Sequence, residues 1–514
     1  MRFRKWAAGL LAVLCGFTAL SLAGHAQAAS SIRIYLDGKW IQSDVAPYIM
    51  PKANLTMVPV RVISQGLGAN VVWTQKTKTV TIRKSGTTII MKVGQKTATV
   101  GGAKTALDAP VALTNNRVTV PLRFISERLG LQVKWNPTTQ WIQLMTKPGH
   151  EIKGAWISTV YNLDWPSVAS YGSPDTQKQE YAVLLDDLQG MGMNAVYVQV
   201  RPNADALYPS KLAPWSKYLT GVQGQDPGYD PLAYMIEETH RRGMEFHAWF
   251  NPFRANTDAT LNGLSPQHVA VLHPDWIVNA GGKLYVNPGI PAARQHIIDV
   301  IMEVVKNYPI DGIHLDDYFY PSGSNFDDDA AFLAYNAKKI ANKDDWRRDN
   351  VNDFVKKLGQ AIHSAKPQVS FGISPFGVWR NQSDDSSGSD THASVTAYDD
   401  MHADVRSWIR GNWVDYVMPQ LYWSIGYPAA GYDKLVQWWA HEVDGSNVKL
   451  FIGHSPYKLG TSEAGWQTSA EIVNQLKFNE TYPQVRGDVF FSAKDLRRNP
   501  LDVIGALKAY YQIK

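Results

Sequence analysis

The sequence predicts an α/β protein: a (β/α)₈ barrel, the TIM-barrel fold, preceded by a small α+β domain with two repeats. Three observations predict it. Strand-like and helix-like stretches alternate through the C-terminal two thirds of the chain, eight strand candidates can be counted there, and a seven-residue motif occurs twice nearer the N-terminus. A length of 514 residues is enough for more than one domain.

Residues 1–28 have the features of a secretory signal peptide. Basic residues at the start precede an apolar run over residues 6–22, and Ala-Gln-Ala at 26–28 offers a small-residue cleavage site. Cys15, the only cysteine, lies in this run, so the processed chain could form no internal disulfide. No later stretch is long and apolar enough to cross a membrane. We expect a secreted or cell-wall-associated bacterial protein, the alternative being an uncleaved membrane anchor.

Residues 30–147 contain the internal repeat. Val-Pro-Val-Arg-Val-Ile-Ser at 58–64 returns 62 residues later as Val-Pro-Leu-Arg-Phe-Ile-Ser at 120–126. Each copy continues through Leu-Gly to a tryptophan and a β-rich stretch, which predicts a short helix followed by a hairpin. One such unit is too small to bury its own apolar face, so the two copies should pack together.

The same domain is strongly basic. Residues 30–147 hold 16 Lys and Arg against 4 Asp and Glu, a net charge of +12, whereas the chain from Pro148 onward carries −10. A basic domain on an acidic body is expected to dock on an anionic partner, and outside the cell that partner is an anionic cell-wall polymer or a membrane surface rather than nucleic acid. The alternative is that the charge only keeps the domain soluble.

After Lys147-Pro148-Gly149, residues 150–514 alternate between the strand and helix periods. The expected strands are residues 154–160, 194–201, 244–251, 311–316, 369–374, 414–423, 448–454 and 488–493. The expected helices are residues 178–190, 231–242, 291–308, 351–365, 404–409, 432–443, 470–479 and 501–511. Eight strands, each followed by a helix, match a closed barrel better than an open doubly wound sheet. No glycine-rich phosphate loop follows the first strand, which disfavours nucleotide binding.

Several expected strands carry polar residues on one face, because alternate residues of a strand point the same way. Burying so many polar groups in a packed core is costly, so we expect them to line a substrate-binding mouth. The alternative for each is a structural hydrogen bond. The candidate substrate-binding residues on these strands and the loops beside them are Tyr161, Asp164, Arg201, Asn203, His247, Trp249, Asn251, Arg254, His314, Tyr318, Gln420, Tyr422, Trp423 and Tyr457.

The fourth expected strand ends in two adjacent carboxylates, Asp316 and Asp317, followed by Tyr-Phe-Tyr-Pro. Active sites of (β/α)₈ barrels lie at the carboxyl ends of the strands. Carboxylates beside aromatic rings at such a place indicate hydrolysis of a sugar chain. A helix cap is disfavoured by the Tyr-Phe-Tyr-Pro run. A calcium site lacks a regular ligand loop, although three consecutive aspartates at 327–329 keep it open.

Most glycosidases use two carboxylates, and no other expected strand ends in one. The second is therefore either the neighbour within the pair or a loop residue: Asp164, Asp205 or a carboxylate of residues 384–400. Two carboxylates on one strand also suit substrate-assisted hydrolysis, in which the N-acetyl group of the sugar is the nucleophile. We expect Asp317 to be the acid and Asp316 the orienting group, with the reverse assignment open.

No metal or cofactor is expected. Metal hydrolysis would draw on the histidines of the strands, but their spacing matches no common zinc pattern. These histidines are His247, His314 and His454.

Several multi-residue motifs of the second domain, in order along the chain, resemble glycosyl-hydrolase-like family ten. They are GAWISTVYNLDWP at 154–166, RPNADALYPS at 201–210, WFNPFR at 249–254, DGIHLDDYFYP at 311–321 and MPQLYW at 418–423. The resemblance runs from about residue 153 to the C-terminus. It implies a (β/α)₈ barrel, an exported bacterial protein and glycoside hydrolase activity. Some relatives cut peptidoglycan stripped of stem peptides, between N-acetylmuramic acid and N-acetylglucosamine. Asn203 departs from the acidic residue of many relatives, which puts a catalytic role of that position in doubt.

The repeat domain resembles the copper amine oxidase N-terminal-like stalk domain. The resemblance implies attachment or spacing rather than catalysis, and residues 30–147 contain no His or Cys cluster that would hold copper. The whole sequence therefore predicts a secreted, wall-associated glycoside hydrolase acting on an N-acetylated glycan, peptidoglycan strands above all. The alternatives are a non-catalytic glycan-binding protein and a hydrolase of another exported polysaccharide, such as a glucan.

Overall fold

The computed structural model describes residues 32–36, 39–50, 55–61, 64, 69–84, 87–129, 131–136, 141–146 and 151–513. The chain divides into two compact units between Lys147 and Pro148. The expected signal peptide at 1–28, the break at 147–149 and part of the first repeat lie outside the described residues. No helix within the described part is long and apolar enough to cross a membrane.

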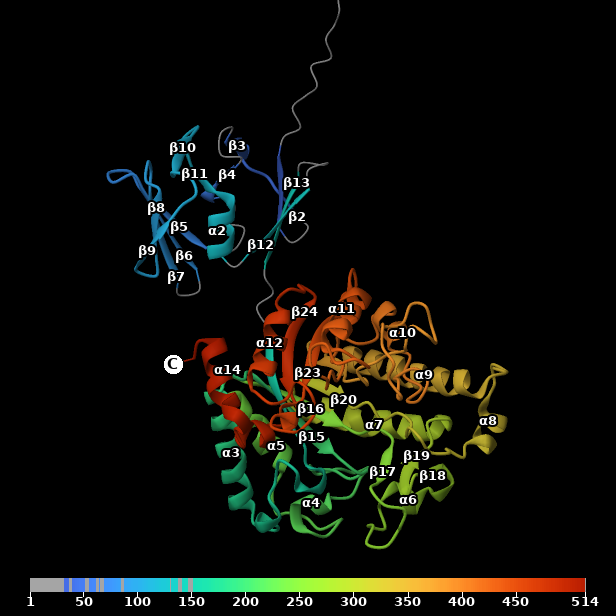
Figure 1. Cartoon of the computed structure of the whole chain (residues 1–514). Coiled ribbons are helices and arrows are strands. Elements are labelled where there is room, and N and C mark those ends of the chain that lie inside the picture. The colour runs from blue at the N-terminus through green and yellow to red at the C-terminus, as the bar shows by residue number, and fades with distance from the viewer. Residues whose placement is uncertain are drawn as a thin grey trace, which may run out of the picture. The chain divides into compact units, whose positions relative to one another are not determined.

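Within the described residues, the first unit contains three sheets, antiparallel or mixed, and the helix α2 (Figure 1). One sheet has the order β12-β13-β1-β2, the second β10-β11-β4-β3 and the third β5-β6-β7-β8-β9. The elements are β1 (Arg33–Leu36), β2 (Lys39–Ile41), β3 (Tyr48–Met50), β4 (Leu55–Pro59), β5 (Asn70–Thr74), β6 (Thr79–Lys84), β7 (Thr87–Lys92), β8 (Thr97–Val100), β9 (Ala103–Ala106), β10 (Ala112–Thr114), β11 (Arg117–Pro121), α2 (Leu122–Arg128), β12 (Leu131–Asn136) and β13 (Trp141–Thr146).

The two copies of the repeated motif pair directly with each other. Strand β4 runs antiparallel to β11, with Val58 opposite Val120. Both valines are fully buried in a core that also takes Ile82 from the first copy and Ile142 from the second. In the second copy, α2 leads into the β12–β13 hairpin, as the sequence predicts. Neither copy could close this core alone.

The second unit is a closed eight-stranded parallel barrel, which confirms the predicted fold class and excludes the open sheet. Strand β24 pairs with β14 in parallel and closes the ring. The barrel strands are β14 (Ile152–Ile157), β15 (Ala195–Arg201), β16 (Glu245–Phe250), β20 (Gly312–Leu315), β21 (Ser370–Ile373), β22 (Tyr416–Val417), β23 (Lys449–His454) and β24 (Val485–Phe490).

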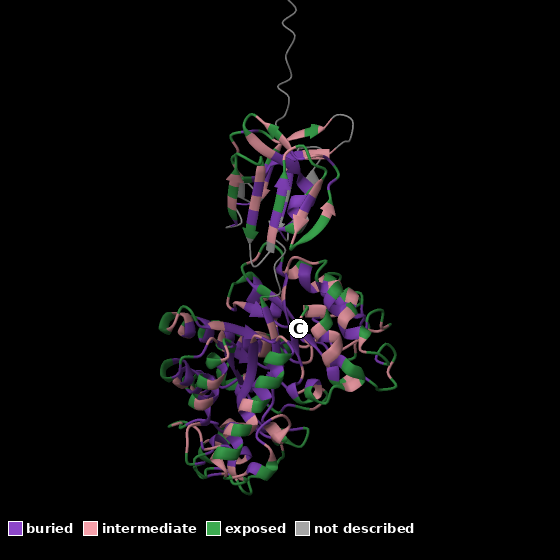
Figure 2. Ribbon diagram, turned by 90° about the vertical axis from the view of Figure 1, so that its left-hand side faces the viewer, coloured by how far each residue is buried: buried purple, intermediate pink, exposed green. Residues whose placement is uncertain are grey.

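Helices surround the barrel. Those at the predicted helix positions are α3 (Pro174–Gly190), α5 (Pro231–Arg241), α7 (Pro291–Asn307), α9 (Lys343–Ala365), α10 (Val405–Arg410), α11 (Tyr432–Val443), α12 (Ala470–Asn479) and α14 (Val503–Tyr511). Short ones are α4 (Lys217–Thr220), α6 (Val269–Leu272), α8 (Asp329–Tyr335) and α13 (Ala493–Arg497). The strands and the inward faces of these helices are almost entirely buried (Figure 2).

The bounds of several elements differ from those expected, and α9 begins at Lys343 rather than at residue 351. Strand β22 is much shorter than the predicted 414–423, since Pro419 has no N–H to continue the ladder. Strand β24 begins at Val485 and ends at Phe490, and Ser492 is already the N-cap residue of α13. A small sheet of β17 (Arg254–Asn256), β18 (Ile277–Ala280) and β19 (Lys283–Val286) follows β16 and was not predicted.

Large rings fill the barrel interior. Trp156, Tyr197, Trp249, Tyr416 and Phe451 form one buried cluster inside the ring of strands. Small residues make room for them: a Cβ on Gly372 would lie 2.1 Å from the ring of Tyr416. This packing closes the barrel below the strand ends, so only residues at or beyond those ends can meet a substrate.

Candidate active site

Asp316 and Asp317 follow β20 at the carboxyl end of the barrel. Asp316 is 8% and Asp317 4% exposed. The backbone N–H of Asp317 donates a 2.8 Å hydrogen bond to Oδ1 of Asp316, which holds the Asp316 carboxylate against the backbone of Asp317. Within the described part of the chain neither forms an ion pair, so no neighbouring cation neutralises either one.

Asp317 has the environment of a protonated acid. Its pKa is raised well above the ordinary aspartate value, first by burial and then by the negative charge of Asp316. A contact with the side chain of Gln420 acts in the opposite direction but is smaller. Oδ1 of Asp317 is buried without a hydrogen-bond partner. A neutral carboxyl group with an unused oxygen can donate a proton to a leaving group.

Asp316 is fixed by a chain of side-chain amides. Nδ2 of Asn251 donates to Oδ2 of Asp316, and Nε2 of Gln199 donates to Oδ1 of Asn251. Oε1 of Gln199 in turn accepts the backbone N–H groups of Thr159 and Val160, both at 2.9 Å. Strands β15 and β16 and the loop after β14 therefore together set the orientation of the Asp316 carboxylate.

Removing this support should lower turnover. Asn251→Ala is expected to reduce kcat about 10- to 100-fold with little change in KM, because Asp316 stays in place but loses its orientation. Initial rates on a glycan substrate measure it. Asn262→Ala, in an exposed loop after β17, is the matched control. An Asn251→Ala enzyme with the parent kcat would contradict the positioning role.

Tyrosine rings surround the carboxylates. The pKa of Tyr318, which is 42% exposed, is raised first by the charge of Asp317 and then by burial. The pKa of Tyr422 is raised by burial, then by Tyr457 and the two aspartates. The Tyr422 and Tyr457 rings meet at 89° with centroids 5.9 Å apart. The rings of Tyr318 and Tyr457 are half-exposed, and a sugar ring bound at the site can stack on their faces.

A cation lies on the same side of the site. Nε of Arg254 donates to the carbonyl oxygen of Pro202 at 2.9 Å, while its Nη2 is buried without a partner. The positive charge of Arg254 acts on both Tyr318 and Tyr285 to lower their pKa, against larger causes that raise it. Arg254 as a whole is partly exposed, so its guanidinium group can meet an anionic group of a ligand beside the tyrosines.

Other predicted residues sit at the rim. Tyr161 is mostly exposed, and its ring meets that of Tyr218 edge-on at 6.5 Å. Nδ2 of Asn203 donates to the hydroxyl of Tyr218 at 3.1 Å, and Oδ1 of Asn203 has no partner. The rings of Trp423 and Phe376 meet edge-on at 6.0 Å.

Four predicted binding residues lie elsewhere, which corrects the expectation that they line the mouth. Trp249 belongs to the interior ring cluster, and Nη1 of Arg201 binds the carbonyl oxygens of Asn251 and Pro252 at 2.9 and 3.1 Å. Nε2 of His247 lies 3.0 Å from Oε2 of Glu245, the first residue of β16. The His247 side chain therefore points to the amino-terminal end of the barrel strands, away from Asp316 and Asp317. His314 accepts from Nε1 of Trp156 at 3.1 Å, and its burial lowers its pKa well below the usual value.

The proposed loop carboxylates are occupied by structural bonds. Asp164 accepts the backbone N–H groups of Ser158 and Lys494 at 2.8 and 2.6 Å and the Ser492 hydroxyl at 2.7 Å. Burial raises its pKa to about 6. Asp205 accepts the backbone N–H of Asn203 at 3.0 Å. These bonds hold loops in place, and they leave Asp316 and Asp317 as the two adjacent carboxylates of the site.

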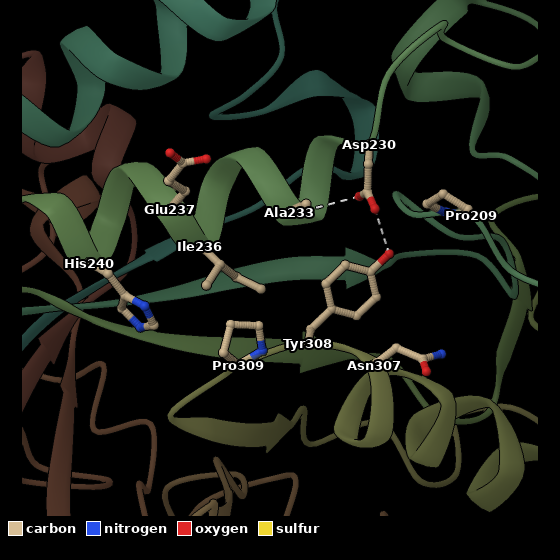
Figure 3. Close-up of a pocket in the computed structure, with 9 residues that line it drawn as sticks. All are labelled: Pro209, Asp230, Ala233, Ile236, Glu237, His240, Asn307, Tyr308 and Pro309. Carbon is tan, nitrogen blue, oxygen red and sulfur yellow. Dashed lines mark hydrogen bonds between the residues drawn. The ribbon is translucent and has the colours of Figure 1, made fainter.

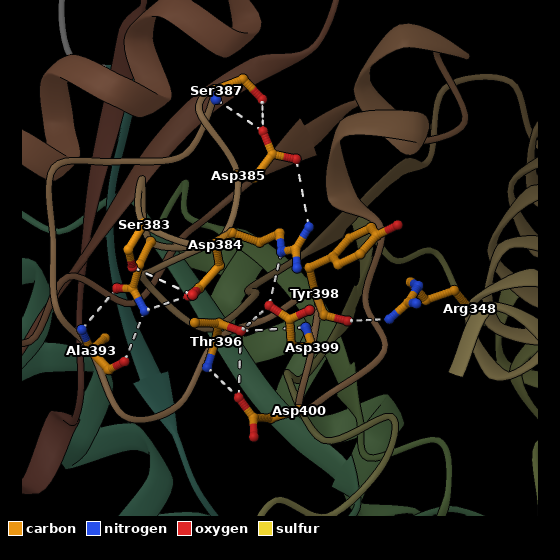
Figure 4. A network of polar contacts seen from close by, with 12 residues as sticks. Arg348, Ser383, Asp384, Asp385, Ser387, Ala393, Thr396, Tyr398, Asp399 and Asp400 are labelled. Carbon is orange, nitrogen blue, oxygen red and sulfur yellow. Dashed lines mark hydrogen bonds and ion pairs between the residues drawn. The ribbon is translucent and has the colours of Figure 1, made fainter. Parts of the chain in front are cut away.

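The acidic loop 384–400 folds on itself (Figure 4). Asp399 accepts from Nε of Arg380 at 2.9 Å, and Asp400 accepts the backbone N–H of Thr396 at 2.7 Å. Asp384 takes a hydrogen bond from Asn381 at 3.1 Å. Asp385 pairs with Arg380 and Asp390 with Lys434, so each carboxylate of the loop has a partner within the protein.

The structure does not bring the candidate metal ligands together. His454 faces the helices, with Nε2 2.7 Å from Oδ1 of Asp488, far from the interior positions of His247 and His314. Asp328 is buried against Arg347 and Lys343, each at 2.7 Å. Within the described residues no three His, Cys, Asp or Glu side chains form a group that could hold a metal ion.

A separate cavity of about 750 Å³ lies on the outside of the barrel, between α5 and the segment that leads from α7 into β20. The hydroxyl of Tyr308 spans it to Oδ2 of Asp230 at 2.7 Å, and Glu237 and His240 lie along the same helix (Figure 3). None of the residues predicted to act on a substrate lines this cavity.

Comparison with known proteins adds to this geometry. Residues 151–471 match the family described as glycosyl hydrolase-like 10, and residues 35–144 match the copper amine oxidase N-terminal domain. Glycosyl hydrolase YngK of Bacillus subtilis (strain 168) is 54% identical over 362 residues, covering 70% of this chain and 71% of that protein. Glycosyl hydrolase DigH of Escherichia coli (strain K12) is 41% identical over 363 residues, covering 66% and 82%. Among solved structures, the PgaB glycoside hydrolase domain of Bordetella bronchiseptica is 12% identical with a TM-score of 0.47, covering 71% of this chain and 99% of that one.

Proposed function

This chain belongs to the glycosyl hydrolase-like 10 family, and we propose that it is a glycoside hydrolase that cleaves N-acetylated peptidoglycan strands. The observation that carries the proposal is the buried carboxyl pair: Asp317 has a raised pKa beside an Asp316 fixed by Asn251. One member of the pair is prepared to give a proton and the other is held in a set orientation.

The proposed reaction is assisted by the substrate. Asp317 donates its proton to the glycosidic oxygen as the bond to the anomeric carbon breaks. Asp316 holds the N-acetyl group of the same sugar, whose carbonyl oxygen attacks the anomeric carbon and forms a cyclic oxazolinium intermediate. Water then attacks the anomeric carbon, Asp317 takes the proton from that water, and the acetamido group is restored. No covalent bond to the protein is needed.

Two features support a peptidoglycan substrate. The half-exposed rings of Tyr318 and Tyr457 can stack on sugar faces. The partly exposed guanidinium group of Arg254 can bind a carboxylate, a group that N-acetylmuramic acid carries and N-acetylglucosamine lacks. A neutral glucan would leave this donor unused.

The proposal extends to location and attachment. A secreted or wall-associated enzyme agrees with the features of residues 1–28, and the net charge of +12 over residues 30–147 supports docking on an anionic wall polymer. Such docking depends on charge, so it should weaken as salt is raised.

A panel of glycans tests the proposal. The purified protein is incubated with peptidoglycan strands stripped of stem peptides, with intact sacculi, with chitin and with a glucan, and products are identified by mass spectrometry. We expect fragments made of N-acetylglucosamine and N-acetylmuramic acid from the stripped strands and none from the glucan. Products from the glucan alone would show a different polysaccharide hydrolase. Binding to the strands with no product from any glycan would show a non-catalytic binding protein.

A further inference from the structure

The N-terminal unit contains a cavity of about 680 Å³ that the barrel chemistry does not use. It lies where the end of β4, the β5–β6 hairpin and the β10–β11 hairpin meet, so both halves of the repeat contribute to it. Ligand pockets of proteins usually enclose about 300–1,000 Å³. The cavity is therefore large enough for a ligand of one or two sugar residues.

One wall of the cavity is an anchored indole. Trp73 lies on β5, where half-buried and exposed residues alternate, and it pairs across the hairpin with the buried Val80. Its Nε1 donates a 2.7 Å hydrogen bond to Oε1 of Gln75, which also lines the cavity. The bond restricts rotation of the ring. A fixed, half-buried tryptophan beside a hollow is suited to stacking on the apolar face of a sugar.

The lining of the cavity also carries charge. Nε of Arg117 donates to Oδ2 of Asp44 at 2.8 Å, so this carboxylate and guanidinium hold each other in place. Arg61 lines the same cavity, is exposed, and has no ion pair within the described part of the chain. The amides of Gln42 and Asn116 complete the polar lining. Amide and carboxylate groups bind hydroxyls, and an unpaired guanidinium binds a carboxylate.

We propose that this cavity is a second saccharide site, which binds one or two residues of a carboxylate-bearing glycan strand. Trp73 stacks on a ring, and Arg61 takes the carboxylate. The identity of the strand as peptidoglycan rests on the proposed function of the barrel. The surplus of positive charge over residues 30–147 matches an anionic ligand. A site on each unit would raise the time the chain stays on one polymer without changing the chemistry.

Sedimentation with insoluble strands tests the proposal. The full chain carrying Asp317→Asn, which keeps the strands intact, is mixed with stripped peptidoglycan or with chitin, and the bound fraction is measured. Adding Trp73→Ala is expected to weaken binding to peptidoglycan about tenfold, and Arg61→Ala several-fold. Arg83→Ala, an exposed arginine of β6 outside the cavity, should leave binding unchanged. Chitin should be bound more weakly than peptidoglycan, and Arg61→Ala should not weaken it further.

Two further measurements separate this site from the barrel. Trp73→Ala in the otherwise unmodified chain should cleave a short soluble oligosaccharide within twofold of the parent rate. Trp73→Phe should restore most of the binding that Trp73→Ala loses. Arg61 lies on the surface, so Arg61→Ala should not disturb folding. Unfolding therefore cannot explain the weaker binding of both alanine variants. Parent-like binding by both Trp73→Ala and Arg61→Ala would overturn the proposal. Another outcome is that the parent chain cleaves no glycan, while Trp73→Ala still weakens its sedimentation with the strands. That outcome would refute the proposed function of the barrel but not the proposed saccharide site in the cavity.

Discussion

Replacing Asp317 with Asn is expected to lower kcat on stripped peptidoglycan strands by about 10²- to 10⁴-fold. Asn has nearly the same shape, so the contacts around the site remain, but its amide cannot deliver the proton that the leaving oxygen needs. Because binding contacts are kept, KM should change little. Initial rates over a range of strand concentrations separate the two quantities.

The pH dependence of the parent enzyme is a second test of Asp317 as the acid. Burial and the charge of Asp316 raise the pKa of Asp317, so the competent, protonated acid persists to higher pH than for an ordinary aspartate. We expect kcat/KM to fall as pH rises through that raised pKa. The Asp317→Asn enzyme should lack this decline in its residual rate.

A substrate with a good leaving group assigns the two aspartates. A nitrophenyl glycoside of N-acetylglucosamine needs no proton on its leaving oxygen, so Asp317→Asn should recover most of its activity there. Asp316→Asn should not recover, since the N-acetyl group is still left without its orienting carboxylate. Recovery by Asp316→Asn and not by Asp317→Asn would show that the roles are reversed.

The Asp317→Asn substitution should also raise the free energy of unfolding. A carboxyl group whose pKa is higher in the folded than in the unfolded state binds more protons when folded, so stability falls as pH rises above the unfolded value. An Asn side chain does not titrate in this range, so the substitution removes this loss of stability at higher pH. Chemical denaturation should therefore show Asp317→Asn to be more stable than the parent at pH 7, with a smaller difference at pH 4. An equal difference at both pH values would show that Asp317 is not held protonated by its surroundings.

The barrel could be predicted because its signals are local. Each strand is a short apolar run, and each helix between them repeats its apolar residues at the helical period. The small sheet of β17, β18 and β19 could not be predicted in this way. Its strands have three or four residues each, too few for alternation to show, although Gly281-Gly282 marks the turn between β18 and β19. Tyr285, beside Arg254, was missed for this reason.

The positions of the candidate site residues could be predicted only in part, because alternation along a strand gives the face of a residue and not its depth. His314 shares a face with Asp316 and His247 shares one with Asn251, but in each case the histidine lies lower in the barrel. Gln199 shows the opposite error. It was not among the predicted binding residues, and its role in holding Asn251 depends on the loop after β14, which no spacing along β15 reveals.

The largest expected effect on stability comes from Asp488, which is fully buried on β24. Oδ1 of Asp488 accepts from Nε2 of His454 and from Nδ2 of Asn479, both at 2.7 Å, while Nδ1 of His454 lies 2.9 Å from Oε1 of Gln475. The carboxylate thus links β23, β24 and α12. Asp488→Ala would leave the His454 nitrogen and the Asn479 amide buried without this acceptor, and it would open a void where water is excluded.

We therefore expect Asp488→Ala to lower the free energy of unfolding by about 3–5 kcal/mol, measured by chemical denaturation. Asp327→Ala, at an exposed position, should change it little and serves as the control. The loss should also reach the site, because Nε2 of Gln475 donates to the carbonyl oxygen of Trp423 at 3.1 Å and so fixes the segment that carries Gln420 and Tyr422. An Asp488→Ala chain as stable as the parent would mean that His454 and Asn479 find other partners, and that this network does not hold the mouth of the barrel in shape.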